Sequence, residues 1–363
     1  MPPIERKYFV CANSSQGFFS FFSENLTGLD QVYILKAGPG TGKSTLMRRV
    51  GGHFLKKGYD IDYIYCSSDP QSLDGLLIPK LRVAIVDGTH PHVIEPTAPG
   101  ALEQYVNLGT AWNLDLLSSH REKILNLRNT STQAYKKLYS HYANALNIHD
   151  DWEKVYIDAI DREKADAFKK DVCKNLLNFP KINRKALEKH RFFGASTPTG
   201  TVDFVENLID PIATRYFIKG RPGTGKSTLL RSIVKHMTSL GYDTDIYHCS
   251  FDPKSLDMVV INELGICFFD ATAPHEYEPS REGDHILDTY KIFVQENTDE
   301  NNQEEIKGFE EEYKKEMALG RLALAEARAA HDELEEIYKK ATNFEILDGF
   351  YEQIKDRIEE LEK

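Results

Sequence analysis

Long apolar runs are absent from this chain of 363 residues. No stretch approaches the ~20 consecutive apolar residues that a membrane-spanning helix needs. The beginning of the chain carries Glu5, Arg6 and Lys7 with no apolar core behind them, which is unlike a secretory signal. We therefore expect neither a membrane span nor an export signal.

Cysteine and positive charge are also in short supply. The five cysteines are widely spaced and contain no C-x-x-C pair, which indicates reduced thiols and excludes a disulfide framework or a zinc site. Basic residues number 45 against 56 acidic ones, and the net charge of −11 argues against nucleic acid as a partner. These properties predict a cytoplasmic protein, and at ~150 residues per domain the length predicts about two domains.

The chain consists of one unit that occurs twice. A shift of 183 residues superposes residues 9–100 on residues 192–283 without a gap, and 36 of the 92 aligned pairs are identical. Pro180 and the basic run 181–191 lie between the two copies, and a proline disfavours helix at the residue before it. The sequence therefore predicts two domains, residues 1–183 and 184–363.

Each copy alternates short β-rich apolar runs with helical stretches, which predicts an α/β fold with parallel, doubly wound sheets. The sequence then becomes long, charged and helix-forming, at residues 101–177 and 285–363. Apolar residues recur there at three- and four-residue steps, so we expect helical insertions or tails with a packing face. That face is available to a protein partner or for self-association. The β-rich runs are residues 8–12, 32–36, 61–66 and 83–87, and then 191–195, 216–219, 245–249 and 266–270.

Two glycine-rich loops carry the strongest functional signal. The second copy reads Gly220-Arg-Pro-Gly-Thr-Gly-Lys-Ser227, the full G-x-x-x-x-G-K-[ST] pattern, and the first reads Ala37-Gly-Pro-Gly-Thr-Gly-Lys-Ser44. The glycines allow backbone amides to turn toward an anion, and the lysine reaches the β and γ phosphates of a nucleotide. The predicted nucleotide-binding residues are Gly38, Pro39, Gly40, Thr41, Gly42, Lys43, Ser44 and Thr45, and Gly220, Arg221, Pro222, Gly223, Thr224, Gly225, Lys226, Ser227 and Thr228.

An acidic anchor for Mg²⁺ follows at the same distance in both copies. Asp87 and Asp270 each end an apolar run, 44 residues beyond the lysine of the loop. Gly88 and Ala271 stand where many P-loop ATPases have a glutamate that orients the attacking water, so another residue must take that role. The predicted metal ligands are Ser44, Asp87, Ser227 and Asp270.

Two polar patterns recur at strand ends that should face the ligand. In C-S-x-D-P-x-S-L-D, Asp69 and Asp252 either orient an acceptor hydroxyl or water, or form an ordinary turn. In D-x-T-x-P-H-x-x-E-P, the threonine and histidine are placed to sense the γ phosphate, and the glutamate to polarise water; loop hydrogen bonds are the alternative. The predicted catalytic residues are Lys43, Lys226, Glu95, Glu278, Asp69 and Asp252.

These motifs make the chain resemble the P-loop nucleoside triphosphatases, and its tandem arrangement is similar to an uncharacterised group of bacterial two-copy ATPase or nucleotide-kinase-like proteins. The resemblance implies ATP and Mg²⁺ as ligands and two P-loop domains, each with a long helical insertion or tail. No N-K-x-D guanine signature occurs, so we expect adenine. We favour a Mg²⁺-dependent ATPase with two nucleotide sites, because long charged helices suit mechanical coupling. The alternatives are a small-molecule or nucleotide kinase and a non-hydrolysing nucleotide-dependent switch.

Overall fold

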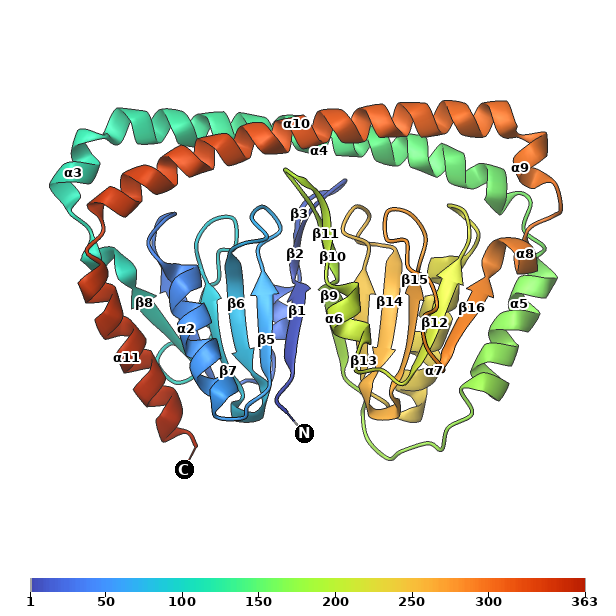
Figure 1. Ribbon diagram of the computed structural model, residues 1–363, viewed down its shortest axis with the longest axis horizontal. Helices are drawn as coiled ribbons and strands as arrows, with labels where there is room; N and C mark the ends of the chain where they lie inside the picture. Colours follow the sequence, from blue (N-terminus) through green and yellow to red (C-terminus); the bar gives the residue numbers. More distant parts are fainter. Residues whose placement is uncertain (1, 363) are drawn as a thin grey trace.

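The computed structural model describes residues 2–362 as an α/β protein built on one large mixed sheet (Figure 1). The first half contributes β1 (Glu5–Phe9), β4 (Gln31–Lys36), β5 (Ile61–Tyr65), β6 (Leu73–Ile78), β7 (Val83–Asp87) and β8 (Glu103–Asn107). The second contributes β9 (Glu188–Phe192), β12 (Thr214–Lys219), β13 (Thr244–His248), β14 (Leu256–Ile261), β15 (Ile266–Asp270) and β16 (Asp284–Asp288). Two separate hairpins are β2 (Cys11–Ser14) with β3 (Gly17–Ser20), and β10 (Gly194–Thr197) with β11 (Gly200–Asp203).

The twelve strands follow the order β16-β12-β15-β14-β13-β9-β1-β5-β6-β7-β4-β8, so both halves repeat one arrangement on either side of the β9–β1 joint. The prediction of parallel sheets is wrong for one strand in each half. The β6 and β14 strands run antiparallel to both of their neighbours. The segments that join β6 and β14 to the neighbouring strands are short. Short connections favour antiparallel pairing, because a parallel pair needs a long crossover.

The helical segments also begin differently from the prediction. Each starts with an extended strand, β8 or β16, that pairs in parallel with β4 or β12. These pairs satisfy the backbone groups that an open edge of β4 or β12 would expose. Only after these strands does the chain become helical.

The helices of the first half are α1 (Phe22–Asn25), α2 (Lys43–Lys56), α3 (Leu114–Ser119), α4 (Arg121–Ile157) and α5 (Arg162–Asp171). Those of the second are α6 (Val205–Ile209), α7 (Lys226–Leu240), α8 (Thr289–Phe293), α9 (Thr298–Asn301), α10 (Gln303–Ala341) and α11 (Phe344–Glu360). Short 3₁₀ turns lie at Pro79–Leu81, Leu108–Ala111 and Asn262–Leu264, and a π turn at Val172–Leu176. Within residues 2–362, no helix is both long and apolar enough to cross a membrane.

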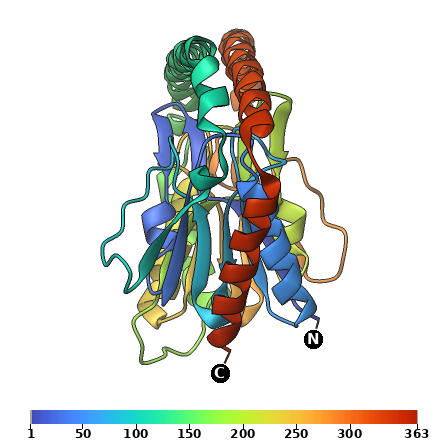
Figure 2. The same ribbon diagram turned by 90° about the vertical axis from the view of Figure 1, so that its left-hand side faces the viewer.

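The long helices α4 and α10 lie side by side and run across the ends of the strands, over both halves of the sheet (Figures 1 and 2). At 1.5 Å per residue, the 37 residues of α4 span about 55 Å, so this helix passes from its own half to the other. Leu138 and Tyr142 of α4 pack against Leu324 of α10. Gly320 allows this close approach, since a Cβ there would lie 2.4 Å from the Tyr142 ring. Ion pairs such as Lys137–Glu326, at 2.9 Å, flank the contact.

Each half therefore exchanges its final helix with the other. The α11 helix of the second half lies along α2 of the first, where Ile354 and Ile358 enter the core and Glu359 Oε1 lies 2.7 Å from His53 Nε2 (Figure 2). The α5 helix of the first half packs on the second, with the Phe168 ring 5.5 Å from that of Phe293. The swap makes the two halves one folding unit.

Buried charge joins the halves at the centre of the sheet. Strands β1 and β9 meet antiparallel at Phe9 and Phe192. Next to them, the Arg191 guanidinium lies 4.0 Å from the Tyr8 ring centroid and within 3.5 Å of both Asp62 and Asp245. These two carboxylates, one from each half, compensate a cation that would otherwise be costly to bury.

Candidate functional site

Each glycine-rich loop connects a strand, the second from an outer edge of the sheet, to a helix, and the motif requires such a strand-to-helix connection. Loop one (residues 37–42) joins β4 to α2, and loop two (residues 220–225) joins β12 to α7. Gly40, Gly42, Gly223 and Gly225 have φ between +67° and +86°, a region that L side chains rarely adopt. The loop amides and the positive end of the following helix together form a nest for an anion.

The lysine that begins each helix pairs with the acid that ends the neighbouring strand. Lys43 Nζ lies 3.4 Å from Asp87 Oδ2, and Lys226 Nζ lies 3.3 Å from Asp270 Oδ2. All four side chains are largely buried. The sheet brings them together because β4 and β7, like β12 and β15, are adjacent parallel strands.

The predicted metal ligands at each loop offer one hydroxyl and one carboxylate, from the serine and the strand-end aspartate. The Ser44 and Ser227 hydroxyl oxygens accept the amide hydrogens of Leu73 and Leu256, at 3.0 and 2.9 Å. Each serine is next to the lysine that contacts the strand-end aspartate. Hydroxyl and carboxylate oxygens are hard ligands of the kind that Mg²⁺ binds, together with water and phosphate oxygens.

Glu95 and Glu278 lie on exposed loops after this strand end. Glu95 accepts a hydrogen bond from the Tyr105 hydroxyl and lies 3.7 Å from Lys36 Nζ. Glu278 Oε1 lies 2.7 Å from Lys219 Nζ. Because these lysines end β4 and β12, both glutamates are tethered just before the loops, and their role toward water stays a prediction.

Asp69 and Asp252 lie in tight turns. Asp69 accepts hydrogen bonds from the Ser72 hydroxyl at 2.7 Å and the Gln71 amide at 3.1 Å, and it pairs with Arg328 of α10 at 2.8 Å. Asp252 accepts the amide hydrogen of Lys254 at 3.2 Å. The turn contacts are present in both halves, and in the first half Asp69 also ties the turn to the long helix.

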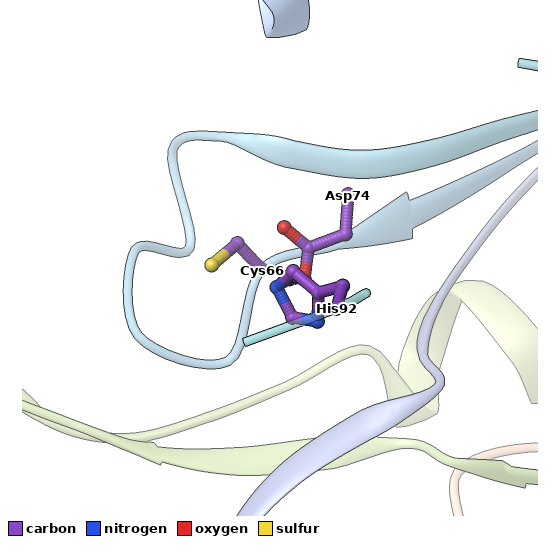
Figure 3. A group of neighbouring side chains, drawn as sticks. All are labelled: Cys66, Asp74 and His92. Carbon is purple, nitrogen blue, oxygen red and sulfur yellow. Dashed lines mark ion pairs between the residues drawn. The ribbon is translucent and has the colours of Figure 1, made fainter. Parts of the chain in front are cut away.

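A buried group behind Asp87 was only partly visible in the sequence. Figure 3 shows Cys66, Asp74 and His92 converging from the end of β5, from β6 and from the loop after β7. Their candidate ligand atoms all lie within 4.8 Å of one another. The His92 Nε2 atom is 3.2 Å from Asp74 Oδ2, and burial raises the pKa of the Cys66 thiol to about 12. The group is thus held by an ion pair, with a thiol that stays protonated.

The histidine has different partners in the two halves. Burial lowers the pKa of His92, but Asp74 and hydrogen bonds to the Cys11 and Cys66 thiols outweigh it, so the net pKa lies well above its ordinary value. In the second half, His275 Nδ1 lies 2.7 Å from Asp203 Oδ2 instead. Asp203 replaces the serine found at the corresponding position of the first copy.

Asp74 and Asp257 are functional candidates that the sequence analysis missed. The antiparallel registers Gly75↔Val86 and Met258↔Phe269 place each of them across from the strand-end acid, Asp87 or Asp270. Burial, followed by the charge of Asp270, raises the pKa of Asp257 to about 7. Their position as the final acid of the C-S-x-D-P-x-S-L-D pattern was the available signal.

The helix exchange brings a second set of unexpected residues onto the loops. A Cβ on Gly40 would lie 2.6 Å from the Glu335 carbonyl oxygen of α10, and one on Gly223 would lie 2.5 Å from that of Glu153 of α4. The amide of Gly223 also donates a hydrogen bond to Glu153 Oε1, at 3.2 Å. Each loop is therefore covered by the end of a helix from the opposite half.

The two tryptophans of the chain lie beside these contacts. Trp112 Nε1 donates to the Thr41 hydroxyl of loop one at 3.4 Å, and its ring packs on Tyr338 of α10. Trp152 precedes Glu153 on α4 and packs against Tyr313. One indole therefore lies at each helix end that covers a loop.

Comparison of the chain with protein-family models, curated proteins and solved structures finds no match.

Proposed function

We propose that the protein binds ATP with Mg²⁺ at both loops and hydrolyses it, each loop belonging to a P-loop nucleotide site. One observation carries the proposal. In both halves the motif lysine at the start of the helix lies within 3.4 Å of the acid that ends the adjacent strand. A glycine-rich turn with only a structural role would not need this buried pair on a second strand.

The loop residues would perform binding and charge compensation. Backbone amides of residues 38–43 and 221–226 would cradle the phosphates, and Lys43 and Lys226 would turn from the aspartates to the β and γ phosphates. Ser44 with Asp87, and Ser227 with Asp270, would hold Mg²⁺. When bound, Mg²⁺ neutralises charge on the phosphate oxygens as the γ group departs. The strand-end threonines hold these acids in place: Thr89 and Thr272 hydroxyls donate to them at 2.6 and 2.5 Å.

The helix exchange supports a mechanical use of hydrolysis. Both loops contact the end of a helix from the opposite half, so a nucleotide that displaces this end moves an element about 55 Å long.

The five cysteines are free thiols, which supports our placement of the protein in the cytosol.

Binding and turnover are tested separately. We expect a labelled non-hydrolysable ATP analogue with Mg²⁺ to saturate at two per chain, and at one per chain in each of Lys43→Ala and Lys226→Ala. We also expect phosphate release from ATP without any added acceptor. ADP formation only with an acceptor would identify a kinase, binding without turnover would identify a switch, and no binding would refute the proposal.

A further inference from the structure

We propose that the phosphate loops are kept closed by helix ends from the opposite half, and that Glu153 occupies the anion nest of loop two as an internal competitor of phosphate. This inference rests on the proposed nucleotide function and adds its regulation. Its direct support is the hydrogen bond from the Gly223 amide to Glu153 Oε1. That amide belongs to the nest that would bind phosphate, so the carboxylate and a nucleotide phosphate compete for one donor.

The helix backbone adds a steric component to this competition. The Glu153 carbonyl oxygen lies so close to Gly223 that a Cβ there would be 2.5 Å away. At loop one, a Cβ on Gly38 would lie 2.7 Å from the Tyr338 ring. Nucleotide entry therefore requires the helix end to withdraw from either loop.

The two loops differ in what the glutamate does. Glu335 occupies the position of Glu153 in the second copy, 182 residues later. Its carboxylate pairs with His331 Nε2 at 3.4 Å and Lys339 Nζ at 3.1 Å, on its own helix. Glu153 Oε1 also lies near a histidine of its own helix, 3.9 Å from His149 Nδ1, but this oxygen accepts the Gly223 amide hydrogen as well. These partners, His331 first, lower the pKa of Glu335 to about 2. Only at loop two does the structure place the carboxylate on a loop amide, so Glu335 provides a matched control.

The closed state couples the two sites. The α4 helix covers loop two and α10 covers loop one, and they pack on each other through Leu138, Tyr142 and Leu324. Withdrawal of one helix end therefore strains the packing that holds the other. We expect the first nucleotide to make the second easier to bind.

The fluorescence of Trp152 allows the helix end that covers loop two to be followed. In a Trp112→Phe background, Trp152 is the remaining indole, next to Glu153. We would titrate this protein with Mg²⁺ and a non-hydrolysable ATP analogue and record Trp152 fluorescence. Replacing a charged acceptor by a neutral one weakens a hydrogen bond by about a factor of ten in its equilibrium constant. Because the Glu153 carboxylate competes with the nucleotide, Glu153→Gln should lower the analogue concentration at the midpoint of the titration about tenfold. Glu335→Gln should leave this midpoint within about twofold.

The outcomes separate the inference from the proposed function. If the analogue binds and the Glu153→Gln midpoint equals that of the parent, the inference is wrong while nucleotide binding stands. If equilibrium dialysis finds no bound analogue in parent or variants, the proposed function is wrong and the inference falls with it. Should Glu153→Gln lose its helical circular dichroism signal, Glu153→Ala takes its place: alanine favours the helix and removes the carboxylate altogether, and a lowered midpoint is again expected.

Discussion

Asp74 and Asp257 lie across from the strand-end acids of the two halves. Replacing each of them by asparagine should change the stability of the folded protein in opposite directions. In the first half, Asp74→Asn removes the carboxylate that lies 3.2 Å from His92, and both side chains are almost fully buried. Removing one partner of a buried pair costs about 3–5 kcal/mol. Because His92 can release its proton when it loses Asp74, we expect the lower end, about 3 kcal/mol. For one folding unit of 363 residues, the entropy of unfolding at ~2.1 cal/mol/K per residue is about 0.76 kcal/mol/K, so the fall in Tm is about 4 °C.

In the second half, Asp257→Asn should stabilise the protein above neutral pH. Burial, then Asp270, raises the pKa of Asp257 to about 7 from 3.8, so deprotonation penalises the folded state increasingly between pH 4 and 7. Asparagine removes this penalty. Since the side chain keeps some contact with solvent, we expect a gain of about 1–2 kcal/mol at pH 8 that disappears at pH 4.

The stability loss of Asp74→Asn depends on pH through the protonation of His92, the partner of Asp74. The pKa of His92 in the folded protein lies above its unfolded value, so the stabilisation by Asp74 is complete below about pH 6.5 and is lost as the pH rises through the folded pKa. Urea or thermal unfolding at pH 6 and pH 9 should therefore show a larger Asp74→Asn deficit at pH 6. Equal losses for Asp74→Asn and Asp257→Asn, or a deficit independent of pH, would refute this reasoning.

Two further predictions concern turnover. Asp270→Asn should reduce phosphate release at the second site far more than analogue binding, because metal ligation acts chiefly on charge that develops in the transition state; equal losses in both quantities would contradict the assignment. The double variant Glu95→Gln and Glu278→Gln should still bind ATP but release phosphate ~10²–10⁴ times more slowly, the usual value of general-base assistance. A parental rate would mean that these glutamates are loop scaffolding, and would make Asp69 and Asp252 the leading candidates.

Several features of the fold depended on pairing that the sequence pattern does not encode. Residues 73–78 are apolar enough for a buried strand, but their antiparallel direction follows from the short connections on either side. The strand at 103–107 alternates weakly and becomes a strand because the edge of β4 offers hydrogen-bonding partners. In both cases the neighbouring chain, and not local propensity, decides the conformation.

Some contacts of the candidate site could not be predicted from the sequence either. Asp74 was visible only as the last residue of a repeated turn pattern, and its register opposite Asp87 exists only in the folded sheet. Glu153 lies 70 residues before Gly223 and belongs to the other copy of the repeat, so no local pattern links them. The different partners of His92 and His275 likewise depend on which hairpin side chain reaches each ring.

The sequence by itself determined the duplication, the two glycine-rich loops and the strand-end acids, because these rest on contiguous residues whose backbone requirements are local: glycines for positive φ, an apolar run for the buried strand, and a lysine at the start of the helix. Only the tertiary structure decided that the two sheets merge at β1 and β9 and that the halves exchange their last helices. The apolar stripe of a 37-residue helix would fit a partner in either half. Its length decides where it ends: Tyr139 of α4 still donates a hydrogen bond to Asn13 of its own half, but a helix of about 55 Å extends beyond that half, so that Glu153 lies on the loop of the other (Figure 1).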